Sequence, residues 1–309
     1  MADTTVRVAA VQCSSRMGTA AAVEANACKM EKLAREAAAG GAKIIVFPEA
    51  CLTGYTSQAF LHNWHVPGRR LASRFAGVYP HDVVPRVDAP VVSKLVALAG
   101  ELAVYMSIPF VEEADETTGS DGQEAGEGQG LVYYNSIVLA SPAGKVAAHY
   151  RKTNLWPYVD ESWATAGNSP AVVETEFGRL GLGICFDIHR LEQVYATELP
   201  LWALLYSVAW VGDREAATTE QWFRLDLRKR YLGRGALACH VIAANWSVDR
   251  EYPWDGAGYS SIYNPRGERI AYLSVEEGDE ILYADLPRST NASTTAWEDE
   301  HPELAEDVP

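Results

Sequence analysis

The sequence lacks the features that would connect it to a membrane or to nucleic acid. No uninterrupted apolar run approaches the roughly 20 residues that a membrane-spanning helix needs. Cations are outnumbered, with 26 Lys and Arg against 41 Asp and Glu, and the net charge is −15. Because a protein that binds phosphate groups needs clustered cations, we expect neither nucleic acid nor a membrane as a partner.

Cysteine is scarce, and its few positions are widely spaced. There are five, an odd number without any C-x-x-C pair: Cys13, Cys28, Cys51, Cys185 and Cys239. In a chain of 309 residues this pattern predicts reduced thiols and neither a disulfide framework nor a zinc site. The first residues also lack a basic segment followed by a leader-length apolar run, so we expect no signal peptide and a cytoplasmic location.

The chain is otherwise an ordinary globular sequence in which strand and helix patterns alternate. Strands are predicted over 6–12, 43–49, 104–110, 240–247 and 280–286, with two more in each of the hairpins 131–152, 171–187 and 258–273. Helices are predicted over 21–41, 89–103, 190–200 and 214–236. The two halves each read as strand, helix, strand, helix, strand. We therefore expect one α/β domain over residues 1–286, with two packed sheets and helices outside both.

The last part of the chain, residues 287–309, has almost no apolar periodicity and is acidic. Six of its last twelve residues, from Glu298 on, are Asp or Glu. We expect a tail that contributes little to the core. It either extends into solvent or docks on a partner subunit through Trp297, and we favour docking because an isolated tryptophan among acids is costly to expose.

Three predicted strands end in polar residues that a core does not require: Glu49, Lys152 and Cys185. Sites in α/β folds collect just beyond the carboxyl ends of strands. A free cysteine is often only a small buried hydrophobe, but a nucleophilic one needs a base to take its proton and a cation to hold the oxyanion that forms. The glutamate and the lysine supply these groups. No papain-like "CGSCW" and no P-loop lysine supports another enzyme class.

The motifs around these residues resemble the nitrilase (carbon–nitrogen hydrolase) superfamily. They are "FPEACLTGY" around Glu49, "YRKTNLW" around Lys152 and "GLGICFDI" around Cys185, and they stand in the family's order. The spacings, 103 residues from 49 to 152 and 33 from 152 to 185, are also similar to the family's. The similarity continues in "ALLYSVAW", "RGALACHVIAANWS" and "GYSSIYNPRGE", and covers roughly residues 6–285.

The resemblance implies a four-layer αββα sandwich, paired into homodimers or larger homo-oligomers. It implies Glu49 as general base, Cys185 as nucleophile and Lys152 as stabiliser of the tetrahedral intermediate. The backbone N–H of Phe186 would complete the oxyanion hole. Neither a metal nor a cofactor is implied.

Two stretches differ from the sequence that is usual in the family. "DESWATAGN" aligns with family stretches like "DERRYFTPG", which places Glu161 as a second, positioning glutamate, with Asp160 as its neighbour. Where many members read "CYDIRFPE", this chain reads "CFDIHRLE". The changed His189 is either an extra base or a helix-start residue that faces solvent or a neighbouring subunit.

Aromatic residues lie in or next to the motif loops: Tyr55, Trp156, Trp163 and Trp210. Together with Phe186 they would form an apolar slot for an acyl group, or they are simply core or interface residues. The sequence is compatible with both interpretations. The candidate substrate-binding residues are Tyr55, Trp156, Phe186 and Trp210.

The sequence thus predicts an amidase that cleaves non-peptide C–N bonds of a small molecule through a cysteine thioester. The nearest alternative is an N-carbamoyl amide (ureido acid) hydrolase, for which Arg190 would be the cation that binds a substrate carboxylate. A true nitrilase is less favoured, because nitrilases tend to have Trp-Glu after the cysteine and this chain has Phe186-Asp187. A binding protein without turnover is opposed by the complete set of three residues.

Overall fold

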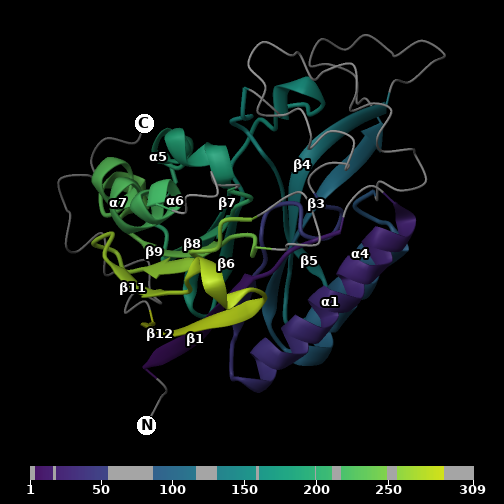
Figure 1. Ribbon diagram of the computed structural model, residues 1–309, viewed down its shortest axis with the longest axis horizontal. Helices are drawn as coiled ribbons and strands as arrows, with labels where there is room; N and C mark the ends of the chain where they lie inside the picture. Colours follow the sequence, from purple (N-terminus) through teal and green to yellow (C-terminus); the bar gives the residue numbers. More distant parts are fainter. Residues whose placement is uncertain are drawn as a thin grey trace, which may run out of the picture.

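The computed structural model describes residues 4–16, 19–54, 86–115, 131–157, 160–198, 200–210, 217–248 and 256–288. Within these ranges the strands form two six-stranded sheets, and Figure 1 shows helices α1 and α4 on one side and α5, α6 and α7 on the other. The helices begin and end as follows: α1 Ala20–Ala39, α4 Pro90–Leu102, α5 Leu191–Val194, α6 Ala217–Gln221 and α7 Leu227–Arg230.

The first sheet has the strand order β12-β1-β2-β3-β4-β5. Its strands are β1 Thr5–Gln12, β2 Ile44–Val46, β3 Tyr105–Asp115, β4 Leu131–Ala140, β5 Val146–Arg151 and β12 Glu280–Pro287. The central strands β1, β2 and β3 are parallel, whereas β12, β4 and β5 join antiparallel to their neighbours. Because β5 runs in the same direction as β2, the two strands end at the same edge of the sheet.

The second sheet repeats this plan in the order β11-β10-β9-β8-β7-β6. Its strands are β6 Val172–Thr175, β7 Gly178–Ile184, β8 Ala203–Ser207, β9 His240–Ala244, β10 Ser261–Tyr263 and β11 Arg269–Tyr272. Here β7, β8 and β9 are the parallel centre, and the outer strands pair antiparallel. The two halves of the chain therefore build equivalent units, as their matching sequence patterns predicted.

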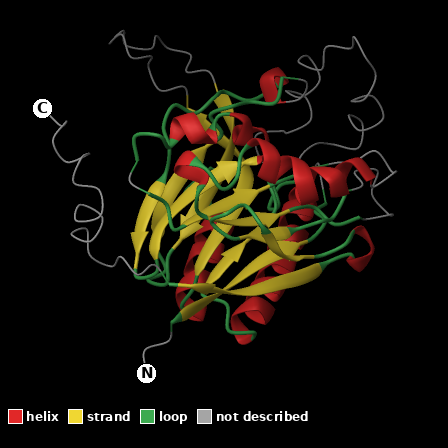
Figure 2. Cartoon of the chain, turned by 90° about the vertical axis from the view of Figure 1, so that its left-hand side faces the viewer, coloured by secondary structure: helices red, strands yellow, loops and turns green. Residues whose placement is uncertain are grey.

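Three apolar cores hold the layers together. On β1, Ala9 and Val11 face the helices α1 and α4, where they pack with Met30. Val8 and Ala10 alternate with them and face the second sheet. A third core lies between the second sheet and its own helices. The order of layers is thus helix, sheet, sheet, helix, as Figure 1 shows, and the predicted αββα sandwich is confirmed. Figure 2 looks along this stack, with helices in front of and behind the strands.

The predicted strands are confirmed, but the central strand β8 was not predicted, and the helix after Cys185 is shorter than predicted. β8 is fully buried, and its continuous apolar run carries no alternation to identify it as a strand. The helix predicted over 190–200 is a 3-10 turn, Cys185–His189, followed by the single turn α5. The helix predicted over 214–236 is described over 217–230, where a π-helical turn, Trp222–Asp226, joins α6 to α7.

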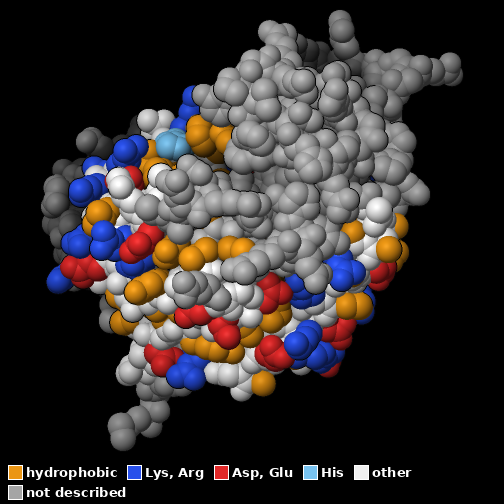
Figure 3. All heavy atoms as spheres, viewed as in Figure 1, with side chains coloured by type: hydrophobic (Ala, Val, Ile, Leu, Met, Phe, Trp, Pro, Cys, Tyr) orange, Lys and Arg blue, Asp and Glu red, His pale blue; other side chains and the backbone are white. Residues whose placement is uncertain are grey.

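Some predictions concern residues that lie outside the described ranges. Residues 289–309 lie outside the described residues, so the tail boundary at 287 and the docking of Trp297 stay predictions. Among the described residues, none of the helices combines the length and the apolar composition of a membrane span. Figure 3 shows acidic and basic side chains intermixed on the described surface of one face.

Candidate active site

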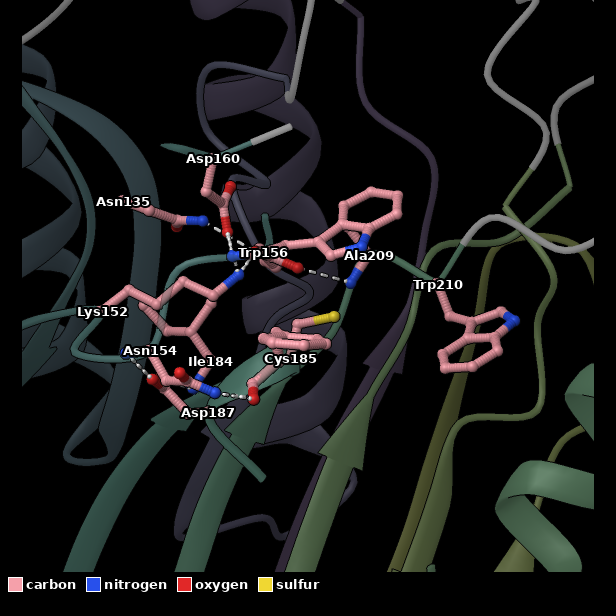
Figure 4. Close-up of polar contacts among 12 residues, drawn as sticks. Asn135, Lys152, Asn154, Trp156, Asp160, Ile184, Cys185, Asp187, Ala209 and Trp210 are labelled. Carbon is pink, nitrogen blue, oxygen red and sulfur yellow. Dashed lines mark hydrogen bonds and ion pairs between the residues drawn. The ribbon is translucent and has the colours of Figure 1, made fainter. Parts of the chain in front are cut away.

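The structure brings Glu49, Lys152 and Cys185 together at one edge of the two sheets. Figure 4 shows Lys152 and Cys185 with the residues around them. Glu49 lies just beyond β2, Lys152 directly follows β5, and Cys185 directly follows β7. Two residues thus come from the first sheet and one from the second. The face-to-face packing of the sheets is what places their side chains in contact.

Glu49 is fixed by hydrogen bonds to both of its carboxylate oxygens. Its Oε1 accepts from Lys152 Nζ at 2.9 Å and from Asn135 Nδ2 at 2.7 Å, and its Oε2 accepts from the Ala209 backbone N–H at 2.9 Å. Its backbone carbonyl accepts from Trp246 Nε1 at 2.7 Å. The side chain is 1% exposed, and this burial raises its pKa against the opposing charge of Lys152.

Lys152 lies between two buried carboxylates. Its Nζ is 2.9 Å from Glu49 Oε1 and 2.6 Å from Asp160 Oδ2, and none of the three side chains is more than 1% exposed. Burial disfavours the ammonium, but the charges of Asp160 and Glu49 outweigh it, so the pKa of Lys152 lies well above its usual value. The lysine therefore remains a cation at any pH at which the protein would work.

A third buried carboxylate fixes the strand that leads to the lysine. Glu112 on β3 accepts hydrogen bonds from Arg151 at 2.6 and 3.1 Å, from His149 at 2.8 Å and from Ser136 at 2.5 Å. Burial would raise the pKa of Glu112, but these partners lower it to about 2. Because Arg151 immediately precedes Lys152, this cluster holds the end of β5 in place.

Cys185 sits on a turn with an unusual backbone. Its φ angle is +39°, in the left-handed region that a non-glycine residue rarely adopts. Tyr206 on β8 donates a hydrogen bond of 2.6 Å to its carbonyl, and the Ala209 N–H, which donates to Glu49, lies near its thiol. Burial and the nearby charge of Glu49 raise the pKa of the thiol, against the opposing effect of Lys152. The sulfur therefore carries its proton at rest.

Asp187 holds this turn against the loop that follows Lys152. Its Oδ1 accepts from the Asn154 N–H at 2.8 Å and from the N–H and hydroxyl of Thr153 at 3.2 and 3.3 Å. Its Oδ2 accepts from Tyr150 Oη at 2.8 Å and from the Ile184 N–H at 2.9 Å. This aspartate had no predicted role, although its position two residues after the cysteine in "CFDI" is a signal present in the sequence.

The expected role of Glu161 is corrected by the structure. Glu161 is exposed, whereas Asp160, its neighbour, is fully buried and contacts Lys152. The two residues lie in the 3-10 turn Asp160–Ser162, where successive side chains point in different directions. Asp160 Oδ2 also accepts from the Trp156 N–H at 2.9 Å, so the loop is folded around this carboxylate.

The candidate substrate-binding residues are only partly described. Three of them, Phe186, Trp156 and Trp210, are partly exposed. Phe186 directly follows Cys185, Trp210 directly follows Ala209, and the Trp156 N–H donates to Asp160. In Figure 4 the sulfur of Cys185 points to the side on which Trp210 lies. Tyr55 lies outside the described residues.

His189 is exposed, and its ring is engaged by neighbouring aromatic residues. Its Nδ1 is 2.6 Å from Tyr231 Oη, and its ring centroid lies 4.4 Å from that of Phe186. Burial of part of the ring and the charge of Arg230 lower its pKa. No described contact joins His189 to Glu49 or Lys152, so the alternative of an extra base gains no support from the structure.

The remaining cysteines differ in their surroundings. Cys13, Cys51 and Cys239 are buried, whereas Cys28 on α1 is exposed. Among the residues that the structure describes, no group of three or more His, Cys, Asp or Glu side chains is arranged to hold a metal ion.

Matched variants of Asp160 and Glu161 test whether Asp160 is the acid that supports Lys152. Asp160→Asn leaves Lys152 with a single carboxylate partner, and loss of a buried ionic partner costs about 3 kcal/mol of unfolding free energy. It also removes a negative charge that raises the pKa of the Cys185 thiol, so this pKa should fall. Urea unfolding and the pH dependence of iodoacetamide alkylation measure the two effects. Glu161→Gln should change neither, and equal effects in both variants would contradict this role of Asp160.

Asp187→Asn should destabilise the nucleophile turn, because an amide cannot accept hydrogen bonds from donors on both of its sides. We expect a loss of about 2–3 kcal/mol in unfolding free energy, the range for hydrogen bonds to a buried charge. Tyr150→Phe removes one of the five donors and should cost only about 1 kcal/mol. Urea unfolding compares the two variants. A smaller loss for Asp187→Asn than for Tyr150→Phe would show that the carboxylate does not hold the turn.

Comparisons with known proteins agree with this architecture. The human omega-amidase NIT2 is 25% identical over 262 residues, which cover 82% of this chain and 79% of that protein. The crystal structure of Saccharomyces cerevisiae Nit3, a member of branch 10 of the nitrilase superfamily, superposes with a TM-score of 0.63 at 20% identity, covering 99% of this chain and 96% of that one.

A mutant of the amidase from Nesterenkonia sp. AN1, with the acetamide moiety of fluoroacetamide added covalently at its active-site cysteine, superposes with a TM-score of 0.65. It is 19% identical, and the match covers 97% of this chain and 98% of that one. Finally, the family model for carbon–nitrogen hydrolases matches residues 7–296, nearly the whole length. This protein therefore belongs to the carbon–nitrogen hydrolase family.

Proposed function

We propose that this protein is an amidase that hydrolyses a small carboxylic amide through a thioester on Cys185. The observation that carries the proposal is the buried network of Glu49, Lys152 and Asp160 beside the thiol, since no packing requirement explains three buried charges. The similarity to omega-amidases and to the Nesterenkonia amidase supports amides as the substrate class.

Acylation begins with transfer of the thiol proton to Glu49 as the sulfur attacks the amide carbonyl carbon. The carbonyl oxygen becomes an oxyanion, which needs donors in place before it forms. Lys152 Nζ has three N–H donors, two of which are used by Glu49 and Asp160. The third is left for the oxyanion, with the backbone N–H of Phe186 as the second donor.

The tetrahedral intermediate then collapses. Glu49 returns the proton to the leaving nitrogen, the C–N bond breaks, and ammonia or an amine departs from a thioester on Cys185. A water molecule that Glu49 deprotonates attacks the thioester carbon. The carboxylic acid leaves, and the sulfur regains its proton. Glu49 thus acts as base and acid in turn, a task that suits a carboxylate whose pKa is raised by burial.

The side chains that would contact the acyl group are Phe186, Trp156 and Trp210, with Asp160 in the positioning role first given to Glu161. A ureido acid or nitrile substrate uses the same thiol and is tested with the same assay. The homo-oligomeric state and the cytoplasmic location stay predictions.

Ammonia release from a panel of amides, ureido acids and nitriles tests the substrate class. We expect turnover of amides and loss of all turnover in Cys185→Ala. Glu49→Gln and Lys152→Ala should each lower kcat on the order of a hundredfold or more, the range for a single acid–base group or oxyanion donor. Cys28→Ala, which removes an exposed thiol, is the control and should leave turnover unchanged. Turnover of ureido acids or nitriles alone would replace the proposed substrate class.

The pH profile tests the role of Glu49. The base acts only when ionised, so kcat/KM should fall as the pH drops through the pKa of Glu49. Burial raises that pKa, and the acid limb should therefore lie above the usual glutamate value of 4.5. Lys152 stays charged well above pH 10.5 and contributes no limb below that pH. An acid limb at or below 4.5, or one that persists unchanged in Glu49→Gln, would exclude Glu49 as the base.

A further inference from the structure

Five aromatic rings in mutual contact form an array beside the nucleophile: Phe186, His189, Trp210, Trp222 and Tyr231. Neighbouring ring centroids are 4.4 Å apart for Phe186 and His189, 5.3 Å for His189 and Tyr231, and 5.0 Å for Trp210 and Trp222. Trp222 closes the array, at 6.0 Å from His189 and 6.1 Å from Tyr231. Phe186 and Trp210 are proposed above to contact the acyl group, whereas the side chains of His189, Trp222 and Tyr231 have no role in the amidase chemistry.

Both ends of this aromatic array adjoin the reacting groups. Phe186 directly follows Cys185, and Trp210 directly follows Ala209, whose N–H reaches Glu49 and the thiol. Cys185 and Trp210 also pack against the same apolar core. Since Figure 4 shows the Cys185 sulfur pointing to the side of Trp210, an acyl group bound to this sulfur would extend toward the array.

The array is rigid, accessible and apolar. Trp210 and Trp222 stack with an interplanar angle of 23°, and the hydrogen bond of 2.6 Å between Tyr231 Oη and His189 Nδ1 fixes the next two rings. Trp222 is buried, whereas the other four rings are partly or largely exposed. Burial and the charge of Arg230 lower the pKa of His189, so the array is uncharged at neutral pH.

We propose that this array is the acyl-group subsite and that the preferred substrates are amides with a planar aryl group on the acyl side. The inference rests on the proposed amidase function. A planar aryl group gains offset-stacking and edge-to-face contacts with fixed rings that an aliphatic group of the same size cannot make. The rings are already ordered, so little conformational entropy is lost on binding.

Phenylacetamide and cyclohexylacetamide form a matched pair that differs in the planarity of the ring. The wild-type protein should show a kcat/KM for phenylacetamide about two- to tenfold higher, the range for aromatic pairing beyond burial of area. Trp210→Leu and Tyr231→Leu should each bring the ratio close to one. Tyr272→Leu, at an exposed aromatic residue on the edge strand β11, is the control and should leave the ratio unchanged. Hydrolysis of amides with no aryl preference in the wild-type protein would overturn the subsite.

A binding measurement separates failure of the subsite from failure of the amidase proposal. Titration calorimetry on Cys185→Ala should show phenylacetamide binding more tightly than cyclohexylacetamide, with the difference lost when Trp210→Leu is added. If no amide is hydrolysed but this selective binding is found, the subsite stands and the amidase proposal fails. If binding is equal for both amides and Trp210→Leu changes the sedimentation of the protein, the array is a subunit interface and the inference is wrong.

Discussion

The ammonium of Lys152, buried between Glu49 and Asp160, is the interaction on which the rest of the structure depends. An ion removed from water is stable only with closely placed counter-charges, so the partners have to be fixed before the lysine can be buried. The three charged residues come from three different segments: Glu49 from the loop after β2, Lys152 from the end of β5, and Asp160 from the turn Asp160–Ser162. The first sheet and the turn that carries Asp160 therefore hold this buried charge in place as well as forming part of the apolar core.

The second sheet contributes the nucleophile under a different constraint. Cys185 needs a left-handed backbone conformation for its thiol to face the buried charges, and such a conformation costs on the order of 1–3 kcal/mol. The surrounding hydrogen bonds outweigh that cost, because Tyr206 holds the carbonyl of Cys185 and Asp187 accepts from five donors. Three of those donors lie in the loop after Lys152, so the same aspartate couples the two sheets at the site.

Much of this arrangement was predictable from sequence, because strand ends and motifs are local features. The positions of Glu49, Lys152 and Cys185 after their strands follow from apolar runs that stop at a polar residue, and the resemblance of the three motifs supplied the sandwich. The strand β8 was missed because it is buried on both faces, which removes the alternation that identifies strands.

The choice between Asp160 and Glu161 could not be made from sequence, since both are acids in one tight turn and only the three-dimensional path of the loop decides which is buried. The aromatic array could not be predicted from sequence for the same reason, because it also depends on the three-dimensional path of the chain. Its rings come from three separate segments: around Cys185, after β8, and from the helical run 217–230 with the residue that follows it, Tyr231. Their contacts depend on how that run packs on the second sheet.

The acyl thioester proposed on Cys185 can be trapped by acid-quenching the protein during turnover of an amide and measuring the intact mass, followed by mapping of the modified peptide. The mass should increase by that of the acyl group, the adduct should lie on Cys185, and it should be absent from Cys185→Ala. Amide turnover with no adduct under rapid quenching, or an adduct on any other residue, would contradict the thioester on Cys185.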